Sequence, residues 1–313
     1  MRVVALVIVA ACGSVKATDV PIDATPIDVT PFENKLHYVI DKELVPTSGQ
    51  QAQMYALDID GNGTKENALG TAFGTLATMG FDVQGGTTLA VDHGVILLLA
   101  ELDTTDLTTA TSASFTTFAG ANPDPAACTS AMDNVCRHHL AGNGAFGIDS
   151  SFPRDPALAG GIVAGAFTGG PGHLAIQIAP FGDLIRLDLL GGKVSVTSFT
   201  DTTITSGILA GAVPKTDIDT KVLPSVVTTI ATIVQRDCPL IVLPPNCNCT
   251  AGSEGATLLS LFDTNPQDCV VSLSELQSSS IVGNLLAPDV TIEGQPSLSV
   301  GIGFTAVHAD FTP

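Results

Sequence analysis

The chain has 313 residues, of which 45% are hydrophobic and 14% are charged, and its formal net charge is −19. These apolar residues suffice for a packed core, which excludes global disorder, and the acidic balance excludes a nucleic-acid partner because phosphates repel such a surface. The absence of tryptophan, with only two tyrosines, argues against a sugar-binding face of stacked aromatic rings.

The N-terminal residues have the pattern of an export signal. Arg2 precedes an apolar run over residues 3–11, which is too short to span a bilayer. The Val-Ala-Ala-Cys sequence at its end resembles the lipobox of bacterial lipoproteins. This resemblance implies a signal peptide over residues 1–11, a lipid on Cys12 and, because glycine and not aspartate follows the cysteine, anchoring in the outer membrane. The alternative is an ordinary signal peptide with an incidental cysteine.

Residues 12–34 comprise the lipidated cysteine and a tether. The motif Pro-Ile-Asp-x-Thr occurs twice at a period of five residues. Regularly spaced prolines block helices and sheet ladders, so they favour an extended spacer. Residues 35–313 are then expected to form a single α+β domain, with a candidate sub-boundary near residues 214–255.

The domain begins with one strand pattern and two helix patterns. Residues 36–45 predict a strand that ends at a proline, and residues 48–56 predict a short polar helix. The apolar residues within 67–79 recur at helical spacing up to a glycine, which predicts a second helix. An Asp-rich loop lies between the two helices.

This Asp-rich loop has the composition of a calcium site. Asp58, Asp60 and Asn62 occupy positions 1, 3 and 5, while Thr64 offers its carbonyl at position 7. Glu66 follows at position 9. Calcium takes six to eight hard oxygen ligands, and alternate loop positions can direct them at one ion. The loop resembles EF-hand and thrombospondin-type-3 loops, although a leucine replaces the glutamate of position 12. The alternative is a tight Asp/Gly turn without an ion.

Strand patterns dominate the middle of the chain. Short apolar segments separated by Gly, Pro and Asp predict an antiparallel sandwich- or barrel-like sheet in an α+β, mainly β fold. Gly191-Gly192 and residues 169–172 are interpreted as hairpin turns. The expected strands cover residues 95–102, 113–118, 145–148, 161–167, 173–179, 184–190, 193–199 and 203–210.

Six cysteines remain besides Cys12, and an even number in an exported chain indicates disulfides. The first two are expected to pair across a small polar loop. The fourth and fifth are one residue apart, so we expect them to pair with the third and the sixth, in either order. The alternative is a four-cysteine zinc site, but the spacing lacks its usual cysteine pairs. The six are Cys128, Cys136, Cys238, Cys247, Cys249 and Cys269.

Helix patterns return after the sheet. The apolar residues of 217–234 fit one helix face, with Thr216 or Asp217 as N-cap. Pro224 is expected to bend or split this helix. The remaining expected elements are helices over residues 256–262 and 272–286 and a closing strand over residues 298–307.

A second candidate calcium loop lies between these last two helices. Asp263 and Asn265 match positions 1 and 3 of an EF-hand loop. Ser272 and Glu275 match positions 9 and 12, which requires one extra residue and places Asp268 at position 5. The segment would be a C-terminal EF-hand-like helix–loop–helix that binds calcium, or a degenerate one with a purely structural role.

The sequence contains neither a G-x-S-x-G nor an H-E-x-x-H motif. We therefore predict a non-enzymatic, exported protein that binds one or two calcium ions and is lipid-anchored to the outer membrane or cell surface. It would serve as a binding, adhesion or structural envelope module for a partner that the sequence does not identify. The alternative is a secreted hydrolase whose site forms only in the folded chain.

Several of these features together resemble a group of surface lipoproteins from myxobacteria-type bacteria. They are the lipobox, the Pro/Asp tether, the Leu-Asp-x-Asp-Gly-x-Gly loop at residues 57–63, and the segments Leu-Ala-Pro-Asp-Val at 286–290 and Gly-Phe-Thr-Ala-Val at 303–307. The resemblance would cover most of the mature chain. It implies a cell-surface location and calcium-type loops, and it implies no particular activity.

Overall fold

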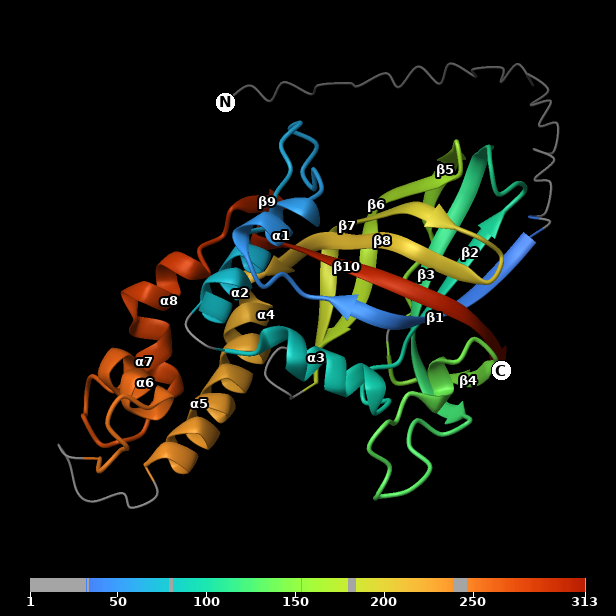
Figure 1. Cartoon of the computed structure of the whole chain (residues 1–313). Helices are drawn as coiled ribbons and strands as arrows, with labels where there is room; N and C mark the ends of the chain where they lie inside the picture. Colours follow the sequence, from blue (N-terminus) through green and yellow to red (C-terminus); the bar gives the residue numbers. More distant parts are fainter. Residues whose placement is uncertain are drawn as a thin grey trace, which may run out of the picture. The chain divides into compact units, whose positions relative to one another are not determined.

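Ten strands of the described chain belong to one sheet, and eight of them close into an antiparallel barrel (Figure 1). The closed order is β1-β2-β3-β5-β6-β7-β8-β10, and β10 returns to β1. Closure gives each of these eight strands a neighbour on both sides, whereas β9 pairs with β10 alone. The strands are β1 (Asn34–Leu44), β2 (Leu98–Thr104), β3 (Ala110–Asp124), β4 (Gly144–Ile148), β5 (Leu158–Val163), β6 (Ala166–Ile178), β7 (Ile185–Phe199), β8 (Thr203–Pro214), β9 (Val290–Ile292) and β10 (Gln295–Thr312).

The computed structural model describes residues 32, 34–78, 81–152, 154–179, 184–238 and 247–312. They all belong to one unit that runs from Phe32 to Pro313. The expected signal peptide, Cys12 and the tether up to residue 31 lie outside the described residues. Among the helices that are described, none is both long and apolar enough to cross a membrane.

Strand β2 shows how alternation builds the core. Leu98, Ala100 and Leu102 belong to the main core cluster, in which the barrel strands meet. Leu97 and Leu99 point to the opposite face, as successive strand residues do, and belong to a second cluster. β2 is therefore buried on both faces. The mainly β, antiparallel and barrel-like architecture expected from the sequence is confirmed.

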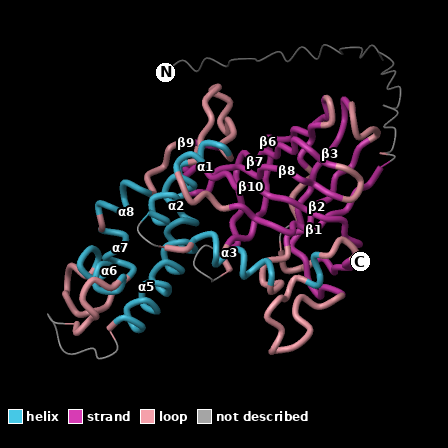
Figure 2. The backbone as a smooth tube through the Cα atoms, viewed as in Figure 1, coloured by secondary structure: helices cyan, strands magenta, loops and turns pink. Residues whose placement is uncertain are grey.

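Most of the helices gather beside the strands (Figure 2). Leu69 and Phe73 of α2 and Leu223 of α5 pack into the main core, whereas Ile230 and Leu258 belong to a separate cluster between helices. The helices are α1 (Gly49–Met54), α2 (Ala68–Thr78), α3 (Val83–Asp92), η1 (His138–Leu140), α4 (Lys215–Asp217), the π-helix η2 (Ile218–Val222), α5 (Leu223–Asp237), α6 (Glu254–Phe262), α7 (Leu273–Ser278) and α8 (Ser280–Leu285).

Asn67 fastens the start of α2 to the barrel. Its buried side-chain amide donates to the carbonyls of Ala52 at 3.0 Å and Gly301 at 2.9 Å. Its side-chain oxygen accepts the N–H groups of Gly70 and Gly301, both at 2.9 Å. The first candidate calcium loop ends one residue earlier, so these bonds also fix the end of that loop.

The two predicted glycine hairpins were wrong. Gly191 and Gly192 lie inside the continuous strand β7, and residues 169–172 lie inside β6. Gly172 pairs with Gly192 at an irregularity of the β6–β7 ladder. A Cβ on Gly192 would lie 2.6 Å from the Cβ of Leu174, so glycine is needed there for close strand approach and not for a turn.

Some other boundaries also differ from the prediction. The expected strand over residues 161–167 contains the turn between β5 and β6, and the expected helix over 272–286 is divided at Ser279 into α7 and α8. The first helix after the sheet begins after Pro214, so neither Thr216 nor Asp217 caps it. Helix α3 was not predicted, because Gly-Gly and Thr-Thr interrupt its apolar pattern.

Candidate functional site

The first candidate calcium loop projects between α1 and α2 and is anchored on the barrel. The N–H of Glu66 donates to the carbonyl of Leu57 at 3.1 Å, which closes the base of the loop. Ile59 is buried against Ala212 and Val290. The loop therefore has a fixed base on β8 and β9, while its polar residues lie at the surface.

Side-chain carboxylates of this loop accept hydrogen bonds from its own backbone. Asp58 accepts the N–H groups of Gly61 at 2.7 Å and Gly63 at 3.1 Å. Asp60 accepts the N–H of Asn62 at 3.0 Å. Gly63, at position 6, has φ +88°, a left-handed conformation that glycine adopts at the sharp turn of EF-hand loops.

Three carboxylates converge in the loop. Ligand oxygens of Asp58, Asp60 and Glu66 all lie within 4.8 Å of one another. The Oε1 atom of Glu66 is buried and has no hydrogen-bond partner among the described residues. Lys193 is close, but its ammonium donates to the backbone carbonyl of Asp58. Within the described chain, no ion pair neutralises these three carboxylates.

Hydrogen bonds join the other two predicted ligands, Asn62 and Thr64, to each other and to Asp60. The side-chain amide of Asn62 donates to Asp60 at 2.9 Å, and its oxygen accepts the N–H of Thr64 at 2.7 Å. Carboxylate, amide and carbonyl oxygens are the hard ligands that calcium prefers, with water completing the shell. The geometry can therefore hold a divalent cation at the three carboxylates.

The second candidate loop is closed by hydrogen bonds of its own. One oxygen of the buried Glu275 accepts the N–H groups of Thr264 at 2.8 Å and Asn265 at 3.0 Å. The other accepts the N–H and the hydroxyl of Ser272, both at 2.9 Å. A carboxylate has about four lone-pair sites, so the donors of this chain fill those of Glu275.

The start of the second loop is bound in the same way. Asp263 is buried and accepts the N–H groups of Asp268 at 3.0 Å and Cys269 at 2.9 Å. Burial alone would raise the pKa of Glu275, but the hydrogen bonds from Ser272, Asn265 and Thr264 outweigh it, and the pKa is lowered. The four hydrogen bonds on Glu275 favour the structural alternative for this loop.

Three disulfides join the six described cysteines. Cys128 pairs with Cys136, as predicted. The other pairs are Cys238 with Cys249 and Cys247 with Cys269, which settles the order that the sequence left open. No thiol of these six is left to ligate zinc, so the zinc alternative is excluded.

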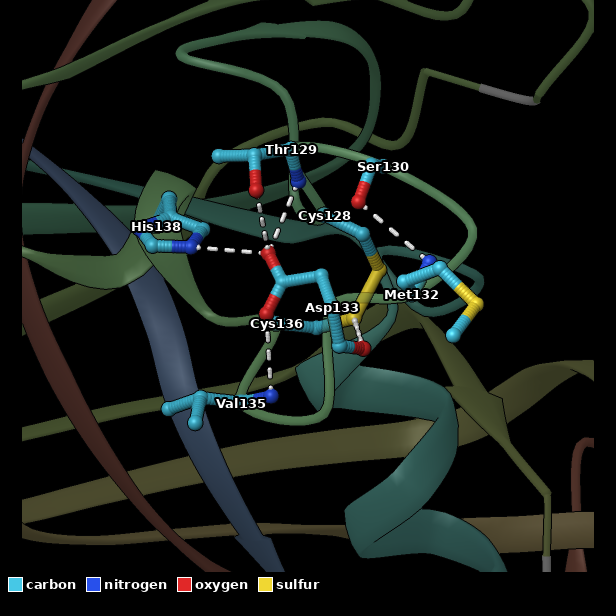
Figure 3. A network of polar contacts seen from close by, with 8 residues as sticks. All are labelled: Cys128, Thr129, Ser130, Met132, Asp133, Val135, Cys136 and His138. Carbon is cyan, nitrogen blue, oxygen red and sulfur yellow. Dashed lines mark hydrogen bonds and ion pairs between the residues drawn. A yellow bond between two sulfur atoms is a disulfide. The ribbon is translucent and has the colours of Figure 1, made fainter.

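The first disulfide lies beside a hydrogen-bond network around Asp133 (Figure 3). Its carboxylate accepts the N–H and hydroxyl of Thr129, both at 2.8 Å, and the N–H of Val135 at 3.0 Å. These bonds, with a contact to His138 at 3.0 Å, hold the pKa of Asp133 far below its usual range. His139 is buried away from this network, with a pKa that burial lowers to about 4.

A cavity lies between helices, in a region where the sequence predicted no site. Its volume is about 350 Å³, and it is lined by residues of α2, α5, α6, α7, α8 and the π-helix η2. Glu254 is the one ionisable residue among those that line it, and its carboxylate lies 2.7 Å from Arg236. The lining residues are Leu69, Ala72, Phe73, Leu76, Phe81, Val222, Leu223, Val226, Ile230, Gly252, Glu254, Thr257, Leu258, Leu261, Phe262, Leu276, Ile281, Val282, Leu285 and Leu286.

Two further polar groups escaped sequence analysis because they assemble only in the fold. Ligand atoms of Asp155, His173 and Asp188 lie within 4.8 Å of one another, and Nδ1 of His173 lies 3.8 Å from Oδ1 of Asp188. Glu43 lines a second cavity of about 100 Å³ and is 2% exposed. Neither of its oxygens has a partner among the described residues, and burial raises its pKa to about 8.

Comparisons with protein-family models, with curated proteins and with solved structures found no match for this chain.

Proposed function

We propose that this chain is a calcium-binding protein of the cell surface, anchored through a lipid on Cys12, and that it acts as a binding module. The observation that carries the proposal is the convergence of Asp58, Asp60 and Glu66, none of which forms an ion pair within the described chain. Like charges at such distances repel one another, and a bound divalent cation would replace that repulsion with attraction.

The chemistry of this interhelical cavity favours a binding role over the hydrolase alternative. A hydrolytic site needs convergent ionisable groups that serve as nucleophile, acid or base. Glu254 is the one ionisable residue in the cavity lining, and Arg236 already pairs with it. Pockets for small molecules are mostly apolar, and a lining without convergent ionisable groups suits uptake of a ligand better than its hydrolysis.

We propose the structural alternative for the second loop. In this proposal the segment from α6 to α7 is a degenerate EF-hand-like helix–loop–helix, and Glu275 holds the loop as an ion would. The four donors on Glu275 support this role, as does the Cys247–Cys269 disulfide that links the loop to the chain after α5.

The anchoring proposal rests on the lipobox, which lies outside the described residues, and on the resemblance to surface lipoproteins. Cys12→Ala is expected to release the protein from outer-membrane fractions into the soluble fraction. Retention of the variant in the membrane fraction would contradict the lipid anchor.

Calcium-dependent thermal unfolding tests the calcium proposal. The melting temperature is expected to fall when a chelator removes calcium, because an ion bound only to the folded state stabilises that state. An unchanged melting temperature would contradict it. Asp60→Asn is expected to reduce the difference between the two conditions, whereas Asp310→Asn, an exposed substitution on β10, is expected to preserve it.

A further inference from the structure

We propose that the interhelical cavity binds the hydrocarbon chain of an uncharged, single-chain lipid. This inference deepens the proposed binding role and rests on it, but it does not require calcium. The residues that line the cavity come mainly from α2, η2, α5, α6, α7 and α8. Figure 1 shows α2, α5, α6, α7 and α8 beside the strands.

The lining of the cavity selects an apolar occupant. Nearly all of its side chains are aliphatic or aromatic, and the exceptions are Glu254 and Thr257, with Gly252 as a backbone contact. An ordered water molecule needs two to four polar partners, which such a lining does not supply. The cavity opens to solvent at exposed residues such as Thr257, so its apolar surface stays in contact with water unless a guest covers it. A cavity of about 350 Å³ is therefore suited to an apolar guest.

The charges at the cavity argue for an uncharged head group. The Arg236 guanidinium lies 2.7 Å from Glu254 and also donates to Asp237 at 2.7 Å. Two carboxylates already hold this cation, and no Lys, Arg or His is among the lining residues. A carboxylate or phosphate head group would find no free counter-charge here, and Glu254 would repel it. A neutral head group at the mouth of the cavity avoids both penalties.

The size of the cavity argues for one chain. If each methylene takes roughly the ~30 Å³ that a water molecule occupies in the liquid, about a dozen methylenes fill the cavity. A two-chain phospholipid would leave its second chain in water. Leu261 and Ile281 line the cavity and are each 37% exposed, so they mark where a chain can enter. The proposed occupant is therefore a monoacylglycerol-type lipid with a chain of about twelve carbons.

The test measures displacement of the uncharged fluorescent probe N-phenyl-1-naphthylamine from the full chain carrying Cys12→Ala, which has no lipid of its own. Monolaurin is expected to displace the probe at micromolar concentration. Monobutyrin is expected to be at least about a hundredfold weaker, because each methylene lost removes buried apolar surface. Laurate is expected to be about tenfold weaker than monolaurin, because its carboxylate has no free partner.

Two pairs of variants locate the binding site. Thr257→Trp fills the mouth of the cavity from α6, and Thr232→Trp is its control on α5, since both threonines are exposed but Thr232 does not line the cavity. Leu261→Asp adds a charge at the mouth, and Ser260→Asp adds one beside it. Thr257→Trp and Leu261→Asp are expected to weaken monolaurin binding about tenfold or more, and the controls are expected to bind as the parent chain does.

Some outcomes overturn the inference. These are failure of monolaurin to displace the probe, equal potency of monobutyrin, binding of laurate as tight as that of monolaurin, and equal binding by Thr257→Trp and Thr232→Trp. Far-ultraviolet circular dichroism shows whether each variant is folded. If Thr257→Trp does not fold, the comparison of Leu261→Asp with Ser260→Asp tests the location of the site. All titrations are repeated with a chelator. A lipid signal that persists without calcium would separate this inference from the calcium proposal.

Discussion

The backbone N–H of Ile59 donates a hydrogen bond of 3.0 Å to Oε2 of Glu66, across the base of the first candidate calcium loop. The bond holds one oxygen of Glu66 in place, while Oε1 is buried without a partner in the described chain. Ile59 itself is packed onto the barrel. The carboxylate is thus positioned by a rigid part of the fold, with one oxygen left for an ion.

Glu66→Gln is expected to weaken calcium binding about tenfold or more, because the substitution keeps the shape of the side chain but removes a charged oxygen ligand. Isothermal titration with calcium measures the effect. Asp106→Asn is the matched control, since Asp106 caps a different turn through bonds to Thr108 and Thr109. Equal calcium affinity of Glu66→Gln and the parent chain would count against a role for Glu66.

Glu275→Gln is expected to lower the free energy of unfolding by about 2–3 kcal/mol, since four donors lose their charged acceptor in a buried loop. The loss is expected to be the same with calcium and with a chelator. Glu254→Gln is the control, because its ion pair with Arg236 is exposed and is worth at most about 1 kcal/mol. A loss that appears only in the presence of calcium would show that Glu275 serves an ion.

Replacement of both Cys247 and Cys269 by serine is expected to cost about 3 kcal/mol, because their disulfide closes a loop of 22 residues in the unfolded chain. Hydrogen exchange in α6 and α7 is expected to accelerate as well. The pair Cys128→Ser and Cys136→Ser, on the barrel side, is expected to leave exchange in α6 and α7 unchanged. Equal exchange in both double variants would refute the local role of the Cys247–Cys269 bond.

Glu43 is expected to make the protein less stable as the pH rises. Burial raises its pKa in the folded protein from 4.5 to about 8. Below pH 4.5 the Glu43 carboxyl is protonated in both the folded and the unfolded chain. Between pH 4.5 and about 8 it loses its proton only in the unfolded chain. The free energy of unfolding contributed by Glu43 therefore falls by about 1.4 kcal/mol per pH unit in this window, and stops falling above it.

Urea unfolding of the parent chain and of Glu43→Gln between pH 5 and pH 9 measures this contribution. The glutamine side chain has a similar shape and stays neutral, so the variant is expected to gain stability relative to the parent chain as the pH rises. Parallel pH profiles of the two proteins would contradict the buried, unpartnered state of Glu43.

Local signals predicted much of the fold. Ser48 caps α1, and the apolar spacing of residues 67–79 forms α2 almost as expected. Short apolar segments separated by Gly, Pro and Asp predicted a sandwich- or barrel-like sheet, and the structure has a barrel. The Gly191-Gly192 pair misled the prediction, because a glycine required for close strand approach and a glycine required for a turn have the same sequence signature.

The candidate sites also differ in how far the sequence predicted them. The ligands of the first loop are close in sequence, so their spacing alone indicated that Asp58, Asp60 and Glu66 would meet. The second loop matched the same pattern, but the pattern does not show which donors take the lone pairs of Glu275. The residues that line the interhelical cavity are spread along the sequence from Leu69 to Leu286, so the cavity forms only when the helices pack together.

The most direct measurement of the central claim is isothermal titration of the calcium-free full chain with calcium, alongside Asp58→Asn. The account predicts one bound ion per chain, with a Kd between about 10⁻⁶ and 10⁻³ M, and loss of that binding in Asp58→Asn. Absence of binding up to millimolar calcium, or an equal affinity in Asp58→Asn, would contradict the calcium site at Asp58, Asp60 and Glu66.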